Sequence, residues 1–134
     1  MRTSGESSVG TTTAHKEAAT EFLRLAAKGE VHLAYDTYVA EDFRHHNPYF
    51  RGDAGSLAHA MKQNAIANPA KLLTVERVIE EGDLVVMHSR VRHNPSDPEA
   101  AVVHIFRFEG DRIAELWDIG QEVPQDSPNQ YGMF

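Results

Sequence analysis

Apolar residues in the first third of the chain recur three and four positions apart, as they do along one face of an amphipathic helix. One such set is Ala19, Phe22, Leu23 and Ala26, and a second is Val31, Ala34, Tyr35 and Tyr38. Thr13 is a candidate N-cap for the first helix, and Gly29 is a candidate stop signal between the two. The spacing therefore predicts two short helices in succession.

A third helix is predicted from Asp53 to about Ala67, after an irregular segment that contains Asn47-Pro48. Asp53 is its candidate N-cap, and Asn68-Pro69 ends the helical pattern. One face of this helix would hold Leu57, Ala60, Met61 and Asn64.

The second half of the chain favours strands. Four runs rich in Val, Ile, Phe and Trp follow one another, as half-buried strands require. Gly82-Asp83 and Gly110-Asp111 each separate two of these runs, which is a hairpin signal. Helices followed by antiparallel strands predict an α+β fold in which the helices cover one face of a curved sheet. A mostly apolar internal pocket is expected between the helices and the sheet.

Composition and charge narrow the classes of partner. The chain has 134 residues, no cysteine and a formal net charge of −7, so a nucleic-acid partner is not expected. The sequence has no apolar run long enough to cross a membrane, and its first residues lack an apolar core segment, so we do not expect them to act as a secretory signal. We predict a flexible tail over residues 1–13, a single domain over residues 14–134, and a cytoplasmic location without a membrane partner.

Polar residues that interrupt the apolar strands are the candidates for chemistry. His88, His104 and Asp118 each stand between apolar neighbours, and Gln121 follows closely. A buried carboxylate or imidazole is costly unless it has a partner. A facing pair could move protons near neutral pH, which makes Asp118 and His104 the candidate catalytic pair. The alternative is that they are satisfied structural groups.

The hairpin register decides whether this pair can meet. If Gly110-Asp111 is a simple two-residue turn, position 104 faces position 117, and His104 and Asp118 then point to opposite faces of the sheet. They share a face only if one strand carries a bulge or the turn differs by one residue. The sequence leaves both registers open.

Two other kinds of site have less support in the sequence. His46, His88, His104 and Asp118 could in principle form a His/carboxylate metal set, but no H-x-H or H-E-x-x-H spacing is present, so we expect no metal. Neither a Gly-rich phosphate loop nor a G-x-S-x-G elbow occurs, which leaves a nucleotide cofactor or a serine hydrolase unsupported.

At this level the chain resembles a known family. The segments "HHNP", "EGDLVVMHSRV", "VVHIFRFEGDRIAELWDIGQEVP" and the terminal "GMF" are similar to the SnoaL-like polyketide cyclase branch of the NTF2-like superfamily, over about Ala14 to Phe134. The resemblance implies a cone-shaped α+β barrel with an internal pocket. It also implies that Asp118 is the acid/base of an intramolecular aldol condensation, that His104 supports it, that no cofactor is needed and that the protein pairs as a homodimer.

The same resemblance places the segment "EDFRHHNPYF" along the pocket wall. We therefore expect a small hydrophobic carbonyl compound to bind there. The predicted substrate-binding residues are His46, Asn47, His88, Trp117, Phe43, Tyr35, Phe106 and Gln121. The reaction would be an aldol cyclisation or an isomerisation.

Two other functions stay open. One is a noncatalytic binding domain of the same fold, in which the polar residues only orient a ligand. The other is an epoxide hydrolase, ranked last because Asp83, Arg90 or Arg92, and Asp118 do not form an obvious Asp-Arg-Asp set.

Overall fold

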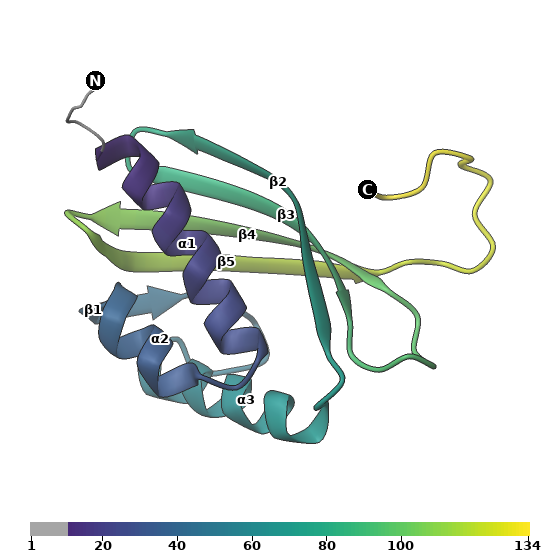
Figure 1. The fold of residues 1–134 in the computed structure, drawn as a ribbon, viewed down its shortest axis with the longest axis horizontal. Coiled ribbons are helices and arrows are strands. Elements are labelled where there is room, and N and C mark those ends of the chain that lie inside the picture. The colour runs from purple at the N-terminus through teal and green to yellow at the C-terminus, as the bar shows by residue number, and fades with distance from the viewer. Residues whose placement is uncertain (1–10) are drawn as a thin grey trace.

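Three helices and one five-stranded sheet make up the part of the chain that the computed structural model describes, residues 11–134 (Figure 1). Their order is α1 (Thr11–Ala27), α2 (Val31–Tyr38), β1 (Val39–His45), α3 (Ala54–Ala67), β2 (Leu72–Glu81), β3 (Leu84–Arg92), β4 (Ala100–Glu109) and β5 (Arg112–Glu122). The predicted α+β class is confirmed. Strand β1 was not predicted, because the segment was interpreted as a loop.

The helices follow the predicted apolar faces. Ala19, Phe22, Leu23 and Ala26 are all buried on α1. Gly29 has φ +92°, a left-handed conformation that suits glycine, and it follows the end of α1 as expected. Asp53 caps α3 by accepting a hydrogen bond from the backbone N–H of Ser56 at 2.9 Å. The predicted N-cap at Thr13 is wrong, because α1 already begins at Thr11. The rest of the predicted tail, residues 1–10, lies outside the described residues.

The strands pair in the order β1-β5-β4-β3-β2. Strand β1 runs parallel to β5, and all other neighbours are antiparallel. Both predicted hairpins are confirmed, since Glu81 pairs with Leu84 around Gly82-Asp83 and Glu109 pairs with Arg112 around Gly110-Asp111. No helix within residues 11–134 is both long and apolar enough to span a membrane.

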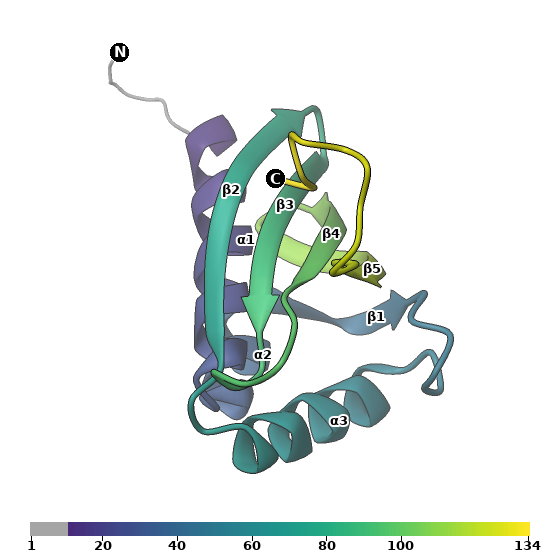
Figure 2. The ribbon, with the colours of Figure 1, turned by 90° about the vertical axis from the view of Figure 1, so that its right-hand side faces the viewer.

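The hydrophobic core lies between the helices and one face of the sheet, which we call the inner face. Helix α1 crosses this face in Figure 1, and Figure 2 shows α3 at one end of the molecule, below α2 and β1. Phe22 of α1 packs edge-on against Phe106 of β4, with ring centroids 6.1 Å apart, and neither side chain is exposed. The strand residues that alternate with the inner ones point to the outer face of the sheet.

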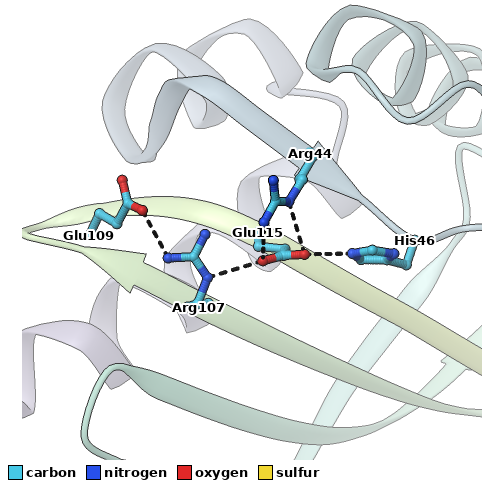
Figure 3. A network of polar contacts seen from close by, with 5 residues as sticks. All are labelled: Arg44, His46, Arg107, Glu109 and Glu115. Carbon is cyan, nitrogen blue, oxygen red and sulfur yellow. Dashed lines mark hydrogen bonds and ion pairs between the residues drawn. The ribbon is translucent and has the colours of Figure 1, made fainter.

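A polar network on the outer face joins β1, β4 and β5 (Figure 3). Glu115 accepts hydrogen bonds from Arg44 Nε at 3.1 Å and Arg107 Nε at 3.0 Å, and its Oε2 lies 2.6 Å from His46 Nε2. Arg107 also donates to Glu109 at 2.9 Å. The contacts with His46, Arg44 and Arg107, in that order, lower the pKa of Glu115 to about 2. The network therefore holds the end of β1 against β5.

The network predicts a pH-dependent stability difference between wild type and Glu115→Gln. The pKa of Glu115 lies below its ordinary value of 4.5 in the folded state, so the ionised carboxylate stabilises the fold above about pH 4.5. We expect the difference in unfolding free energy between the two proteins to shrink as the pH falls from 4.5 toward 2. Urea titrations at each pH measure it.

The control for this experiment is Glu122→Gln, which removes the same charge at an exposed position near the end of the same strand. The difference in unfolding free energy between wild type and Glu122→Gln is not expected to shrink as the pH falls. A difference between wild type and Glu115→Gln that stays constant down to the acid limit would contradict the role of the ionised carboxylate.

Candidate active site

A bulge in β5 brings the two predicted catalytic residues face to face. Phe108 pairs with Ile113, but Arg107 pairs with Glu115, so Ala114 is an extra residue in β5. From this point the register places His104 directly opposite Asp118. Both side chains therefore lie on the inner face. Of the two registers left open by the sequence, the bulged one is confirmed.

The inner face and the helices enclose a cavity of about 300 Å³, which we call the inner pocket. Most of its wall is apolar and comes from α1, α3 and strands β2, β3 and β4. Six polar side chains also line it: Asn47, Asn64, Lys71, His93, His104 and Asp118. An apolar cavity with a few convergent polar groups is the usual form of a small-molecule site.

A wider depression of about 750 Å³ lies along α1, next to the end of α2 and the turn between β4 and β5. Its lining includes Lys16, Glu17, Arg24 and Asp111, all of which are exposed. Charges that stay in contact with water have ordinary reactivity, so we place the candidate chemistry in the inner pocket.

Asp118 is held between two partners in the inner pocket. Its Oδ2 accepts a hydrogen bond from Asn47 Nδ2 at 2.9 Å, and its Oδ1 lies 3.4 Å from His104 Nε2. The exposed fractions are 20% for the Asp118 side chain and 10% for that of His104. Burial lowers the pKa of His104, an effect opposed by the charge of Asp118 and reinforced by that of Lys71. The imidazole is therefore neutral near pH 7, next to a carboxylate.

The loop after β1 fixes the position of Asn47. His45 is buried, and its Nε2 donates to the carbonyl of Arg51 while its Nδ1 accepts from the backbone N–H of Asn47 at 3.1 Å. The Oδ1 of Asn47 accepts from the backbone N–H of Tyr49 at 3.0 Å. These contacts turn the amide group of Asn47 toward Asp118, in agreement with the prediction that Asn47 lines the pocket.

Lys71 is a pocket residue that the sequence analysis missed. It precedes β2, is half-buried, and donates from Nζ to Asn64 Oδ1 at 2.8 Å. Burial lowers its pKa, and the charge of Asp118 acts in the opposite direction. A lysine just after an Asn-Pro turn is typical of a solvated position, so its residue type did not indicate a place in the pocket. The only signal was its place directly before an apolar strand that faces α3.

Four predicted substrate-binding residues lie on the outer face instead. His46 and Trp117 stack there, with ring centroids 4.9 Å apart, and His46 contacts Glu115. His88 contacts Arg77 and stacks on Phe134 at the outer face, and Gln121 is exposed there. The predictions that these residues line the pocket are wrong. The reason is strand alternation, because Trp117 and Gln121 are each an odd number of positions from Asp118.

The three remaining predicted residues form the support beneath the pocket. Phe43 and Phe106 belong to the core, with exposed fractions of 5% and 0%. Phe106 stacks under His104, with ring centroids 6.0 Å apart. The hydroxyl of Tyr35 lies 3.5 Å from Met61 Sδ in the pocket wall, and burial, followed by the charge of Asp118, raises its pKa. These side chains position the site without lining the cavity.

The pocket contains neither the His/carboxylate metal set nor the Asp-Arg-Asp set considered from the sequence. His46 and His88 lie on the outer face, so they cannot join His104 and Asp118 around one metal ion. Within the described part of the chain, no three His, Asp or Glu side chains are grouped as metal ligands. Arg90 pairs with Glu76 at 3.1 Å and with Glu99 at 3.3 Å, which does not form the Asp-Arg-Asp set of an epoxide hydrolase.

The fold and the pocket define a small α+β protein with an internal cavity under a curved sheet. The model of the SnoaL-like domain matches residues 19–116 of the sequence. The chain therefore belongs to the SnoaL-like domain family. No protein with a curated function matches the sequence.

Solved structures agree with this assignment at the level of the fold. A candidate polyketide cyclase from Acidithiobacillus ferrooxidans is 20% identical, with a TM-score of 0.66 over 81% of this chain and 88% of that one. An NTF2-like protein of unknown function from Cytophaga hutchinsonii is 16% identical, with a TM-score of 0.65 over 90% and 95%. A candidate hydroxylase from Streptomyces galilaeus is 19% identical, with a TM-score of 0.67 over 83% and 81%. The predicted NTF2-like fold is confirmed.

Proposed function

We propose that this SnoaL-like protein performs cofactor-independent acid/base chemistry on a small hydrophobic carbonyl compound bound in the inner pocket. The observation that carries the proposal is the pairing of Asp118 with Asn47 and a neutral, buried His104 inside a mostly apolar cavity. The candidate polyketide cyclase among the structural relatives is in keeping with this class of reaction. The predicted homodimer and cytoplasmic location stay predictions.

In the proposed reaction Asp118 is the general base. Its carboxylate takes a proton from the carbon next to the substrate carbonyl, and the electron pair of that C–H bond forms the C=C bond of an enolate. The enolate then attacks a second carbonyl of the same molecule, or regains a proton at another carbon. In both cases Asp118 returns the proton it took, so no net acid or base is consumed.

The partners of Asp118 serve to orient it. Asn47 donates to one carboxylate oxygen and His104 faces the other, so the plane of the carboxylate is fixed before the substrate binds. The mostly apolar wall also reduces the contact of the carboxylate with water, which strengthens its interaction with a developing charge. Such preorganised groups act without rearrangement during the reaction.

Hydrogen–deuterium exchange tests this proposal without knowledge of the natural substrate. The probe is 2-tetralone, a bicyclic ketone with acidic α-protons, and ¹H NMR in D₂O follows the loss of those protons. The wild-type protein is expected to accelerate the exchange over buffer. Ala60→Phe places a ring in the pocket from α3 and is expected to return the rate to the buffer value, since Ala60 lines the cavity.

The matched control is His59→Phe, which adds a phenyl ring at the neighbouring, exposed position of α3, outside the pocket lining. This variant is expected to keep the wild-type rate. Exchange that survives in Ala60→Phe would place the reaction elsewhere. Binding of 2-tetralone by the wild type without any exchange would favour the noncatalytic binding domain.

A further inference from the structure

An enolate formed at Asp118 requires a hydrogen-bond donor for its oxygen. The two donors closest to the carboxylate are already directed at it: Asn47 Nδ2 donates to Oδ2, and His104 Nε2 faces Oδ1. The second nitrogen of His104, Nδ1, is buried and has no hydrogen-bond partner within residues 15–134. His46 lies on the outer face, where it contacts Glu115. A donor on another wall of the pocket would serve the enolate oxygen without disturbing these contacts.

Lys71 is the cation on the facing wall. It directly precedes β2, whereas Asp118 is on β5, and β3 and β4 lie between these strands in the sheet. Both side chains line the same cavity, so a ligand in the pocket is bounded by a carboxylate on one side and an ammonium group on the other. Burial lowers the pKa of Lys71, and the charge of Asp118 opposes this effect.

The ammonium group of Lys71 also has N–H donors that are not used in hydrogen bonds within the part of the protein that the structure describes. A lysine carries three N–H donors, and one of them is used by Asn64 Oδ1 at 2.8 Å. No carboxylate of the described residues forms an ion pair with Lys71. The bond to Asn64 anchors the side chain from α3 while leaving its charge uncompensated by direct contact. A partly desolvated cation of this kind binds an oxyanion more strongly than a solvated lysine does.

We propose that Lys71 is a further catalytic residue, which donates a hydrogen bond to the carbonyl oxygen of the substrate as that oxygen becomes an enolate. The inference rests on the proposed function of Asp118. It requires a substrate whose carbonyl oxygen points to the β2 side of the pocket while its acidic α-carbon lies at Asp118. As the C–H bond breaks, the proton goes to Asp118, the π electrons of the C=O bond move to oxygen, and Lys71 stays protonated.

The test uses 3,4,5-trifluorophenol, a stable mimic of an enol whose ionisation is visible in the ultraviolet spectrum. A pH titration of the bound phenol gives its apparent pKa in the pocket. Lys71→Met is expected to raise this apparent pKa by about one unit relative to wild type, a loss of about tenfold in phenolate affinity. The affinity for the neutral phenol is expected to change little, and Lys71→Arg is expected to restore much of the effect.

The matched control is Lys62→Met. Lys62 is also half-buried and donates a single hydrogen bond, to the carbonyl of Gly29 at 3.0 Å, but it does not line the pocket. This variant is expected to leave the titration of the bound phenol unchanged. An apparent pKa that is the same in wild type and Lys71→Met would overturn the assignment, and so would a wild-type protein that does not bind the phenol.

The phenol titration tests the role of Lys71 separately from the proposed function of Asp118. If 2-tetralone exchange requires Asp118 while Lys71→Met leaves the phenol titration unchanged, the role of Lys71 fails and the general base stands. If wild type does not exchange 2-tetralone at all, the proposed function fails whatever the phenol shows.

Discussion

Asp118→Asn is expected to slow the exchange of the α-protons of 2-tetralone by at least about a hundredfold, the usual range for removal of a general base. The amide keeps the shape of the carboxylate but accepts a proton far less readily. The asparagine can still accept the hydrogen bond from Asn47, which lies 2.9 Å from Asp118 Oδ2 in the structure. The loss of rate should therefore reflect lost chemistry rather than a collapsed pocket.

The matched control is Asp126→Asn, which makes the same substitution at an exposed position of the C-terminal segment. It should exchange 2-tetralone at the wild-type rate, and circular dichroism should show that both variants keep the fold. A wild-type rate in folded Asp118→Asn would exclude this residue as the base. The exchange would then depend on a base other than Asp118.

Phe106→Ala is expected to lower the free energy of unfolding by about 3–5 kcal/mol, as truncation of a buried phenylalanine commonly does. The side chain is fully buried, packs against Phe22 with ring centroids 6.1 Å apart, and lies under His104 at 6.0 Å. Its loss leaves a cavity between α1 and β4 and removes the support of the imidazole. Urea denaturation followed by tryptophan fluorescence measures the effect, since Trp117 lies on the adjacent strand.

Tyr49→Ala is the control for this second prediction. Tyr49 is 85% exposed, so its truncation is expected to change the stability by no more than about 0.5 kcal/mol. Similar losses in both variants would show that Phe106 is not a central core residue. A stable Phe106→Ala protein would also remove the reason given for the fixed position of His104.

The elements of the fold were predictable because their signals are local. The apolar faces of α1 and α2, the cap at Asp53 and the two Gly-Asp hairpins all depend on residues close together in the sequence. Strand β1 was missed because it pairs in parallel with β5, more than sixty residues away. A pairing partner at that distance leaves no mark in the composition of Val39–His45.

The site was predictable in its chemistry but not in its geometry. Asp118 and His104 were singled out as polar residues in apolar strands, yet the bulge at Ala114 decides that they meet. Nothing in the residue type of Ala114 signals a bulge. Because side chains alternate, one misplaced position moves a residue to the other face, as it does for Trp117.

Lys71 was not predicted as a site residue, although it lines the pocket. Its residue type is typical of solvent, and its burial arises only because α3 and the start of β2 close over the same cavity. Burial produced by the packing of distant elements cannot be inferred from a residue's neighbours in the sequence. For that reason the pocket cation was visible only in the folded structure.

The most direct test of the central claim is a crystal structure of the protein with 2-naphthol, the planar aromatic counterpart of the enol of 2-tetralone. We predict that the naphthol occupies the inner pocket, with its C1 carbon beside the carboxylate of Asp118 and its oxygen turned away from that carboxylate. A naphthol bound only on the outer face, or one held in the inner pocket with C1 far from Asp118, would contradict acid/base chemistry at this site.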